Sequence, residues 1–424
     1  MSKTEKSNFS DTAPLSGTVI VLIPYSYPGG TAASLRVFNF VEGLVANLQK
    51  VHVISLYHTP SRRSKTGMYL GQNVTEHFVY SQKYDLQFKN LFSYTSAVAK
   101  SFYKTVDKIA RMEKVRLAYI YDGTSFAYFN LVSKLLQRLS IPIAFDITEL
   151  RDSNYSLRTL MKARDLSLKG KMSNLLLFPD YYFGKNVILK RASFFISIST
   201  ALKTYLASYG KPVIIIPGFE RFIHPANRPS PQANVKLLYI GSLIERDAPG
   251  ALNLVVNEVL HHHKNVEVKF IGRYGASVDG KKFVEELQQV YGNQINSLGE
   301  VREENMEEEM QNADIMILCR KDSLEERCAF PTRLAEYLAL GKAILVSPIG
   351  DIPLYLTDGA DAGFLTLNDD NTLSENSKSL IHRIIVDPDF REEMANHGNK
   401  KGKLYFDNVR NAEEVLKQLQ PHLQ

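Results

Sequence analysis

The sequence lacks a long hydrophobic run and has few cysteines. No apolar segment reaches the roughly 18 residues of a membrane span, and the N-terminus contains no signal-peptide core, so we expect the protein to stay in the cytoplasm. The two cysteines, Cys319 and Cys328, are too few for a disulfide framework and are compatible with reduced thiols. These absences exclude a helix that crosses a membrane and a disulfide-stabilised scaffold.

Motifs of nucleic-acid-binding proteins are also missing. The chain has no RNP-type aromatic motif, no zinc-knuckle spacing and no long basic run. Its net charge of +6 and pI near 8.9 favour anionic partners, among which nucleotide sugars and phospholipid head groups are better supported than nucleic acid. We therefore predict that nucleic acid is not a partner.

The usual dinucleotide fingerprint is absent as well. Gly29 and Gly30 follow the first predicted strand, but they do not form a Gly-x-Gly-x-x-Gly motif, and no acidic residue ends the second strand to bind a ribose. We expect no nicotinamide cofactor. The two glycines either let the backbone approach a ligand closely or simply form a tight turn between strand and helix, and the sequence leaves both interpretations open.

What the chain does contain is a long alternation of apolar strands and amphipathic helices. Hydrophobic residues make up 44% of the 424 residues and charged residues 23%, which is typical of a globular protein of about two domains. The predicted strands are 18–23, 51–56, 117–121, 143–147, 193–199 and 213–216, then 236–243, 266–272, 295–301, 314–318 and 343–346; predicted helices include 35–48, 200–209, 249–262 and 303–312. The alternation predicts the α/β class with a parallel sheet in each domain.

Breaks in this pattern predict the domain boundaries. We expect a disordered tail (1–16), an N-terminal domain (17–224), a linker rich in proline (225–234), a C-terminal domain (235–405) and a final helix (406–424) that is a candidate for packing back on the N-terminal domain. The helical tail from 374 to 423 is predicted to break near Pro388 and near His397.

Two segments of the first half have chemistry of their own. Asp146 and Glu149 lie at the carboxyl end of a strand, where open parallel sheets bind ligands, so they are candidates for contact with an acceptor hydroxyl. A capped carboxylate or an ion pair with Arg151 is the structural alternative. The segment 151–190 mixes basic and aromatic residues, which is typical either of a surface that rests on an anionic membrane or of solvated helix faces around core residues.

The segment 330–353 is predicted to form a loop, a short helix, a buried strand and a second loop. Pro331 precedes the helix, Thr332 is a suitable N-cap, and Gly341 supplies the left-handed residue that ends it. Unpaired amides at the start of this helix, beside Thr332 and Arg333, suit phosphate oxygens, and Glu336 one turn further suits hydroxyl groups. The alternative is an ordinary αβ unit with solvated Arg333 and Glu336.

The order and spacing of several motifs resemble those of GT-B glycosyltransferases, and specifically of the retaining glycosyltransferase family 4. The passages that carry the resemblance are Pro28-Gly29-Gly30, Ile196-Ser197-Ile198-Ser199, Ile216-Pro217-Gly218, Tyr239-Ile240-Gly241-Ser242-Leu243, Phe270-Ile271-Gly272 and Phe330-Pro331-Thr332-Arg333 through Gly341-Lys342. The resemblance implies two Rossmann-like domains with a cleft between them. A nucleotide-diphosphate-sugar donor would bind the C-terminal domain, and a glycan, lipid-linked or protein acceptor the N-terminal one.

The resemblance also implies roles for single residues. Glu336 matches the ligand of the nucleotide ribose, and the positions that match diphosphate contacts are Gly29, Gly30, Ser242, Arg246, Pro331, Thr332 and Arg333. Arg246, Asp146 and Glu149 are the catalytic candidates. Family members need neither a metal ion nor a separate cofactor, so we predict no metal site, and we interpret the run His261-His262-His263 as a solvated helix end, since consecutive helical residues point apart.

Two features depart from the family pattern: the second glutamate is replaced, and the histidine that commonly lines the acceptor side has no clear counterpart, its place being taken by the segment 146–149. Cys328 stands where the family has a second glutamate, eight residues before Glu336, with Glu325 or Glu326 as candidates to replace it. Two alternatives to a retaining glycosyltransferase follow: a catalytically silent GT-B protein that stabilises an active homologue, and a sugar-nucleotide epimerase, for which the sequence shows no additional acid/base set. The predicted location is the cytoplasm, with the inner membrane surface as the site of peripheral association.

Overall fold

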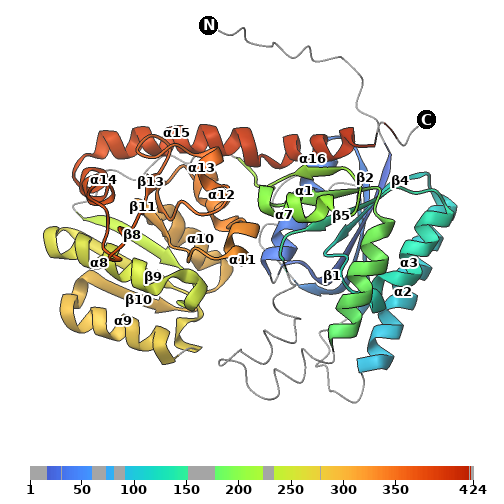
Figure 1. Ribbon diagram of the computed structural model, residues 1–424, viewed down its shortest axis with the longest axis horizontal. Helices are drawn as coiled ribbons and strands as arrows, with labels where there is room; N and C mark the ends of the chain where they lie inside the picture. Colours follow the sequence, from blue (N-terminus) through green and yellow to red (C-terminus); the bar gives the residue numbers. More distant parts are fainter. Residues whose placement is uncertain are drawn as a thin grey trace, which may run out of the picture.

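The computed structural model describes residues 17–29, 31–59, 73–80, 91–150, 177–222, 234–276, 278–419 and 421. In these ranges the chain forms two α/β domains side by side, and the last long helices run along one side of both (Figure 1). No helix in the described ranges is long and apolar enough to span a membrane. The predicted tail, most of the predicted linker and Gly30 lie outside the described residues, as does 151–176 of the basic and aromatic segment.

The N-terminal domain is built on a seven-stranded parallel sheet with the order β3-β2-β1-β4-β5-β6-β7. Its strands are β1 (Thr18–Pro28), β2 (Lys50–Thr59), β3 (Val74–Tyr80), β4 (Val115–Tyr121), β5 (Ile143–Ile147), β6 (Phe194–Ser197) and β7 (Val213–Ile215). Its helices are α1 (Ala32–Ala46), α2 (Leu91–Met112), α3 (Phe126–Arg138) and α7 (Thr200–Ala207), together with a short helix over 177–183 that continues into η4 (Gly184–Ile188) and η5 (Leu189–Arg191).

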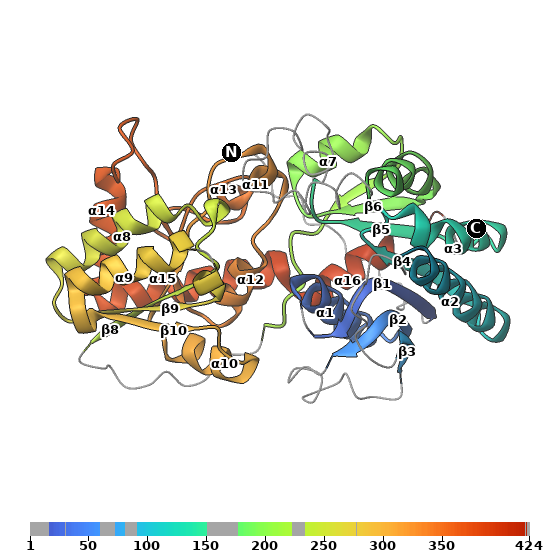
Figure 2. The same ribbon diagram turned by 90° about the horizontal axis from the view of Figure 1, so that it is seen from below.

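Alternation along β1 explains why helices cover both faces of this sheet. Ile20 and Leu22 pack with residues of α2 and α3, whereas Val19 and Val21 pack with residues of α1 on the opposite face (Figure 2). All four side chains are fully buried, as expected for a strand inside a parallel sheet.

The C-terminal domain repeats the design with a six-stranded parallel sheet of order β10-β9-β8-β11-β12-β13. Its strands are β8 (Val235–Ile240), β9 (Val266–Ile271), β10 (Ile295–Gly299), β11 (Ile315–Leu318), β12 (Ala343–Val346) and β13 (Gly363–Phe364). Its helices are α8 (Pro249–His262), α9 (Val278–Tyr291), α10 (Glu303–Asn312), α11 (Leu324–Cys328), α12 (Thr332–Ala339), α13 (Ile352–Tyr355), α14 (Glu375–Val386) and α15 (Pro388–Phe406), with the short turns η6 (Glu245–Asp247), η7 (Arg273–Ala276) and η8 (Gly292–Gln294).

Both sheets therefore have the doubly wound strand order, which confirms the predicted fold class of two Rossmann-like domains. In each sheet the order reverses between the first strand and the fourth, which are β1 and β4 in one domain and β8 and β11 in the other. Ligands of open α/β sheets bind outside the carboxyl ends of the strands at such a switch point. The fold thus fixes where a site should be sought in each domain.

The last helix, α16 (Asn408–Lys417), lies against α1 of the N-terminal domain. Between α15 and α16 the chain passes from the C-terminal domain to the N-terminal one, and Glu220 holds it there. The Glu220 amide donates to the carbonyl of Phe406 at 2.7 Å, and the Glu220 carbonyl accepts from the amide of Asn408 at 2.9 Å. Gly43 of α1 permits this close packing, because a Cβ there would lie 2.2 Å from the carbonyl oxygen of Asn408.

Two local predictions about helix ends are wrong. Thr332 is the first residue of α12 rather than its N-cap; Pro331 occupies the cap position and makes no side-chain capping bond. The break predicted near His397 does not occur, although the break at Pro388 does. The helix α15 continues because Gly398 fits tightly against Leu338, whose Cδ2 would lie 3.0 Å from an added Cβ, so tertiary packing outweighs low helix propensity.

Candidate functional site

The carboxyl edges of the two sheets face each other across the domain boundary. Ser199 and Thr200 follow β6, and Cys328 and Asp351 follow β11 and β12. The Ser199 hydroxyl donates to the carbonyl of Cys328 at 2.7 Å, and the Thr200 amide donates to Asp351 Oδ2 at 2.6 Å. The two switch points thus lie on facing edges, as a site shared by both domains requires.

Two arginines occupy the switch point of the C-terminal domain. Arg246 lies in η6 after β8, and Arg320 lies two residues after β11. Glu326 of α11 joins them: its Oε1 is 3.2 Å from Arg246 Nε, and its Oε2 is 3.8 Å from Arg320 Nε. Arg320 also donates to Asp247 Oδ1 at 2.5 Å. The side chain of Arg246 is 47% exposed and that of Arg320 is 17% exposed, so at least one positive charge is open to a ligand.

The start of α12 contributes to the same region. Burial raises the pKa of the Tyr337 hydroxyl to about 12, and the charges of Arg333, Glu336 and Arg320 act on that same hydroxyl. Arg320, Arg333 and Glu336 thus all lie within electrostatic range of the same buried hydroxyl. We refer to Arg246, Arg320, Glu326, Arg333 and Glu336 as the charged rim.

Glycines hold the loops below the charged rim close together. A Cβ on Gly272, which has a φ of +141°, would lie 1.9 Å from the carbonyl oxygen of Gly241. Ser242 follows, and its amide donates to Asp247 Oδ2 at 3.1 Å. Asp247 thus orders the loop that carries Ser242 and binds Arg320 at the same time. The predicted diphosphate contact Ser242 lies at the switch point with its backbone amide already bonded.

Cys328 does not offer an acid to this region. The residue is 3% exposed, and burial raises the pKa of its thiol. The carboxylate that does reach the charged rim from α11 is Glu326, two residues earlier, with a side chain that is 12% exposed. Of the two glutamates considered as replacements, Glu326 is thus the one that contacts the arginines.

The predicted acceptor residue Asp146 is enclosed instead. Its carboxylate forms an ion pair with Arg36 of α1, at 2.7 Å for Nε and 3.1 Å for Nη2, and also accepts a hydrogen bond from the Tyr119 hydroxyl. The relative exposure of Asp146 is 0%. An acceptor hydroxyl cannot reach it in this conformation, so the structure corrects the prediction. Asp146 holds α1 against the sheet through its ion pair with Arg36. The alternative interpretation expected an ion pair, but with Arg151.

Other N-terminal residues do lie at the carboxyl edge. Gly29 directly follows β1, and its amide donates to the Thr59 carbonyl at 3.1 Å; Glu149 is exposed after β5. Tyr25 and Asp122 meet at the switch point itself, with the Tyr25 hydroxyl donating to Asp122 Oδ2 at 3.1 Å. Asp122 has a φ of +51°, a strained conformation for an aspartate.

Sequence reasoning missed Arg320, Asp122 and Arg36 as site or support residues. Arg320 and Asp122 each follow a strand closely, which is the signal that could have found them. Arg36 carried a different signal, a single arginine among the apolar residues of α1.

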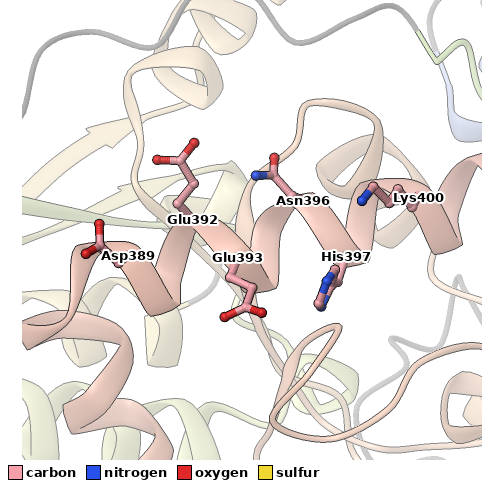
Figure 3. A pocket seen from close by; sticks show the side chains of 6 residues that line it. All are labelled: Asp389, Glu392, Glu393, Asn396, His397 and Lys400. Atoms are coloured by element: carbon pink, nitrogen blue, oxygen red, sulfur yellow. The ribbon is translucent and has the colours of Figure 1, made fainter.

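Two hollows in the described part of the chain lie away from the charged rim. One of about 330 Å³ lies along α15 and is lined by the six residues in Figure 3, all from that one helix. The other, of about 200 Å³, lies between β7 and the helices α15 and α16. Neither is lined by a predicted site residue.

Comparisons with known proteins agree with this architecture. Residues 234–383 match the family model of glycosyl transferases group 1. Among solved structures, sucrose-phosphate synthase from Thermosynechococcus elongatus superposes with a TM-score of 0.63 at 14% identity, covering 95% of this chain and 99% of that one. HepE from Anabaena, in complex with UDP and glucose, gives 0.61 at 15% identity with the same coverage. WaaG, a glycosyltransferase involved in lipopolysaccharide biosynthesis, gives 0.58 at 10% identity, again over 95% and 99% of the two chains.

A search of curated protein sequences finds no significant match. The fold, with its two facing switch points, is that of the GT-B glycosyltransferases. The match to the glycosyl transferases group 1 model covers residues 234–383, and this range contains every residue of the charged rim.

Proposed function

We propose that the protein is a glycosyltransferase that moves a sugar from a nucleotide-diphosphate-sugar to a hydroxyl acceptor. The observation that carries this proposal is the charged rim, which gathers three arginines and two glutamates at the switch point of the domain that matches the family model. The solved complexes of HepE with UDP and with UDP-glucose support a nucleotide-sugar as donor.

The chemistry follows from the charges. Negative charge builds on the leaving diphosphate as the sugar becomes oxocarbenium-like, and fixed positive groups aimed at that charge lower the barrier. Arg246, Arg320 and Arg333 supply these groups, with the free amides at the start of α12. Glu336 accepts hydrogen bonds from the ribose, and Glu326 orients the arginines.

We further propose retention of the anomeric configuration without a metal ion. The leaving phosphate takes the proton of the acceptor on the same face, so no protein nucleophile is required, and the arginines supply the positive charge. Tyr25, Asp122 and Glu149 line the N-terminal edge that would receive the acceptor. The acceptor is a glycan, a lipid-linked sugar or a protein, and a lipid-linked acceptor would bring this cytoplasmic enzyme to the inner surface of the membrane.

The test is a screen of UDP-, GDP- and ADP-sugars for thermal stabilisation, followed by a hydrolysis assay with each sugar that stabilises the protein. We expect one nucleotide class to raise Tm, and we expect Glu336→Ala to remove most of that shift. Glu286→Ala, which changes an exposed glutamate on α9, is the matched control and should keep it. The proposal fails if no sugar nucleotide stabilises the protein and Glu336→Ala has no effect.

A second candidate is a catalytically silent GT-B protein that stabilises an active homologue. The buried Cys328 favours it, because that position supplies no carboxylate to the donor. The two candidates differ in one outcome. A silent protein would be stabilised by a nucleotide or by its partner but would neither hydrolyse nor transfer the sugar, whereas the enzyme would do both.

A further inference from the structure

A cluster of histidines and one glutamate lies on the C-terminal domain outside the charged rim. Glu258 and His262 are one turn apart on α8, and His382 comes from α14, 124 residues after Glu258. One possible ligand atom from each of the three side chains lies within 4.8 Å of the other two. Sugar transfer as proposed above uses none of them.

The spacing of these atoms is close to that of a coordination site. Glu258 Oε1 lies 2.8 Å from His382 Nε2 and 3.7 Å from His262 Nδ1. A tetrahedral zinc ion with bonds of about 2.0–2.1 Å separates its ligand atoms by roughly 3.3–3.4 Å. Both distances are within about half an ångström of that value. Nδ1 of His262 now lies 3.0 Å from the carbonyl oxygen of Glu258, so binding would exchange this hydrogen bond for coordination.

A second histidine holds the ring of His382 in place. Nε2 of His263 lies 2.8 Å from His382 Nδ1, on the side of the ring opposite to the nitrogen that faces Glu258. A histidine that binds a metal usually donates its other ring N–H to a carboxylate, a backbone carbonyl or water, which fixes the tautomer and the ring orientation; here the imidazole nitrogen of His263 is placed to accept that bond. His263 thus has the position of a supporting residue behind a ligand.

We propose that Glu258, His262 and His382 bind one divalent transition-metal ion, with zinc as the best match. Two imidazoles and one carboxylate are a ligand set that zinc accepts, whereas calcium and magnesium prefer oxygen ligands alone. The side chain of His262 is 51% exposed, so the ion can enter from solvent and keep a water molecule as a further ligand.

The location assigns this site a structural role. The 14 residues of α8 span about 21 Å, and the helix begins near the charged rim and ends at the cluster. The ion would therefore lie far from the donor and join α8 to α14. The sequence predicts a solvated helix end for 261–263, and only the packing of α14 adds the ligand His382.

Isothermal titration of the full-length, chelator-treated protein with zinc chloride tests this proposal. We expect one ion per chain, and visible absorption typical of low-symmetry coordination when cobalt(II) replaces zinc. His382→Gln and His262→Gln should each weaken zinc binding by about 10–100-fold or more. Removing a residue that only hydrogen-bonds a metal ligand typically costs about 10–100-fold, and removing a ligand itself should cost no less. His261→Gln is the matched control in the same run and should change the affinity less than about 3-fold, since His261 is not part of the cluster.

Two results would overturn the site. One is zinc affinity that is unchanged in both His382→Gln and His262→Gln, and the other is an equal loss in His261→Gln, which would mean nonspecific binding along the histidine run. The exposed position of His262 keeps the test decisive if His382→Gln fails to fold. A titration with zinc reads out the metal site alone, so its failure leaves the donor screen unaffected.

Discussion

Near the carboxyl edge of the N-terminal sheet one ion pair, Arg36 with Asp146, is enclosed, whereas the arginines at the carboxyl edge of the C-terminal sheet are partly open. Arg36 and Asp146 have side chains that are 2% and 0% exposed, and they form an ion pair with each other. Arg246 and Arg320 share Glu326 and keep contact with solvent. The two sheets have the same strand order, so topology alone does not decide how an edge uses its charges.

The difference separates charges that hold the fold from charges that meet a ligand. A buried ion pair is costly to break, because removing one partner leaves an uncompensated charge away from water. An exposed pair is worth little for stability and can exchange its protein partner for a phosphate. We therefore expect substitutions in the first group to change unfolding and substitutions in the second group to change binding.

The largest effect should come from Asp146→Ala. Because Arg36 would be left buried without a counter-charge, we expect the free energy of unfolding to fall by about 3–5 kcal/mol. Urea unfolding followed by fluorescence or circular dichroism measures this. Asp107→Ala, which removes an exposed pair with Arg111 on α2, is the control and should change it by at most about 0.5 kcal/mol. A loss below that of the control would show that the pair does not hold α1.

Arg320→Ala should have the next largest effect, and it should act on binding. Charged hydrogen bonds are worth about 1.5–3 kcal/mol, so we expect the nucleotide diphosphate to bind roughly 10–100-fold more weakly. Calorimetric titration with the nucleotide found in the donor screen measures this. Arg320→Lys keeps the positive charge but loses the planar guanidinium, so its affinity for the nucleotide diphosphate should lie between those of the unaltered protein and Arg320→Ala. Unchanged affinity in Arg320→Ala would remove this residue from the site.

Arg246→Ala should weaken binding of the bare nucleotide diphosphate by a smaller factor, about 3–10-fold, because its side chain is half exposed and partly neutralised by Glu326. The neighbouring Lys321, which is also half exposed and pairs with Glu245, supplies the control. Lys321→Ala should leave the affinity within about 2-fold. If the two variants lose affinity equally, the effect of Arg246 is one of general charge and not of contact.

The smallest expected effect is a dependence of stability on pH, and it involves two histidines on the paired strands β2 and β3. Nδ1 of His52 lies 3.0 Å from Nε2 of His77. Burial lowers the pKa of His52 below 6.5; Lys50 lowers it further, while Glu113 opposes the shift. Burial also lowers the pKa of His77, and the charges of His52 and Lys108 add to that shift. The folded state therefore binds fewer protons than the unfolded state just below pH 6.5, so stability should fall as pH decreases from 7 toward the lowered pKa values and then level off.

Thermal unfolding at pH 7.5 and pH 5.5 measures this slope. His77→Phe should reduce it, because one of the histidines that resist protonation is then gone. A slope that is unchanged in this variant would contradict the assignment. Glu113 does not produce the effect, since its own pKa is lowered from 4.5 and its contribution is lost only below that range.

The sequence predicted local structure well where composition leaves few options. The strand 343–346 and the helices 249–262 and 303–312 have the bounds that were expected, because apolar runs, Pro249 and the left-handed Gly341 mark their ends. The strand β3 and the helix α2 were not expected. Among the described strands β3 pairs with β2 alone, at the edge of its sheet, and its mixed polar pattern gives a weak signal.

The candidate site was predicted in part. Arg246, Arg333 and Glu336 could be named in advance from motif order, and Glu326 as one of two candidates. The role of Arg320, and the choice of Glu326 over Glu325, depend on the contacts at the switch point. Asp146 was misjudged for a related reason. Its position at a strand end is visible in the sequence, while its partner Arg36 is 110 residues away.

The sequence by itself determined most of the strands, the bounds of several helices, the α/β class and the helix that carries Glu336, because these depend on apolar periodicity and on residues close in the chain. Tertiary structure alone decided which charges are enclosed, which glutamate meets the arginines, and which histidine from α14 completes a cluster on α8. Those outcomes depend on burial and on contacts between distant segments, and local sequence carries no record of either.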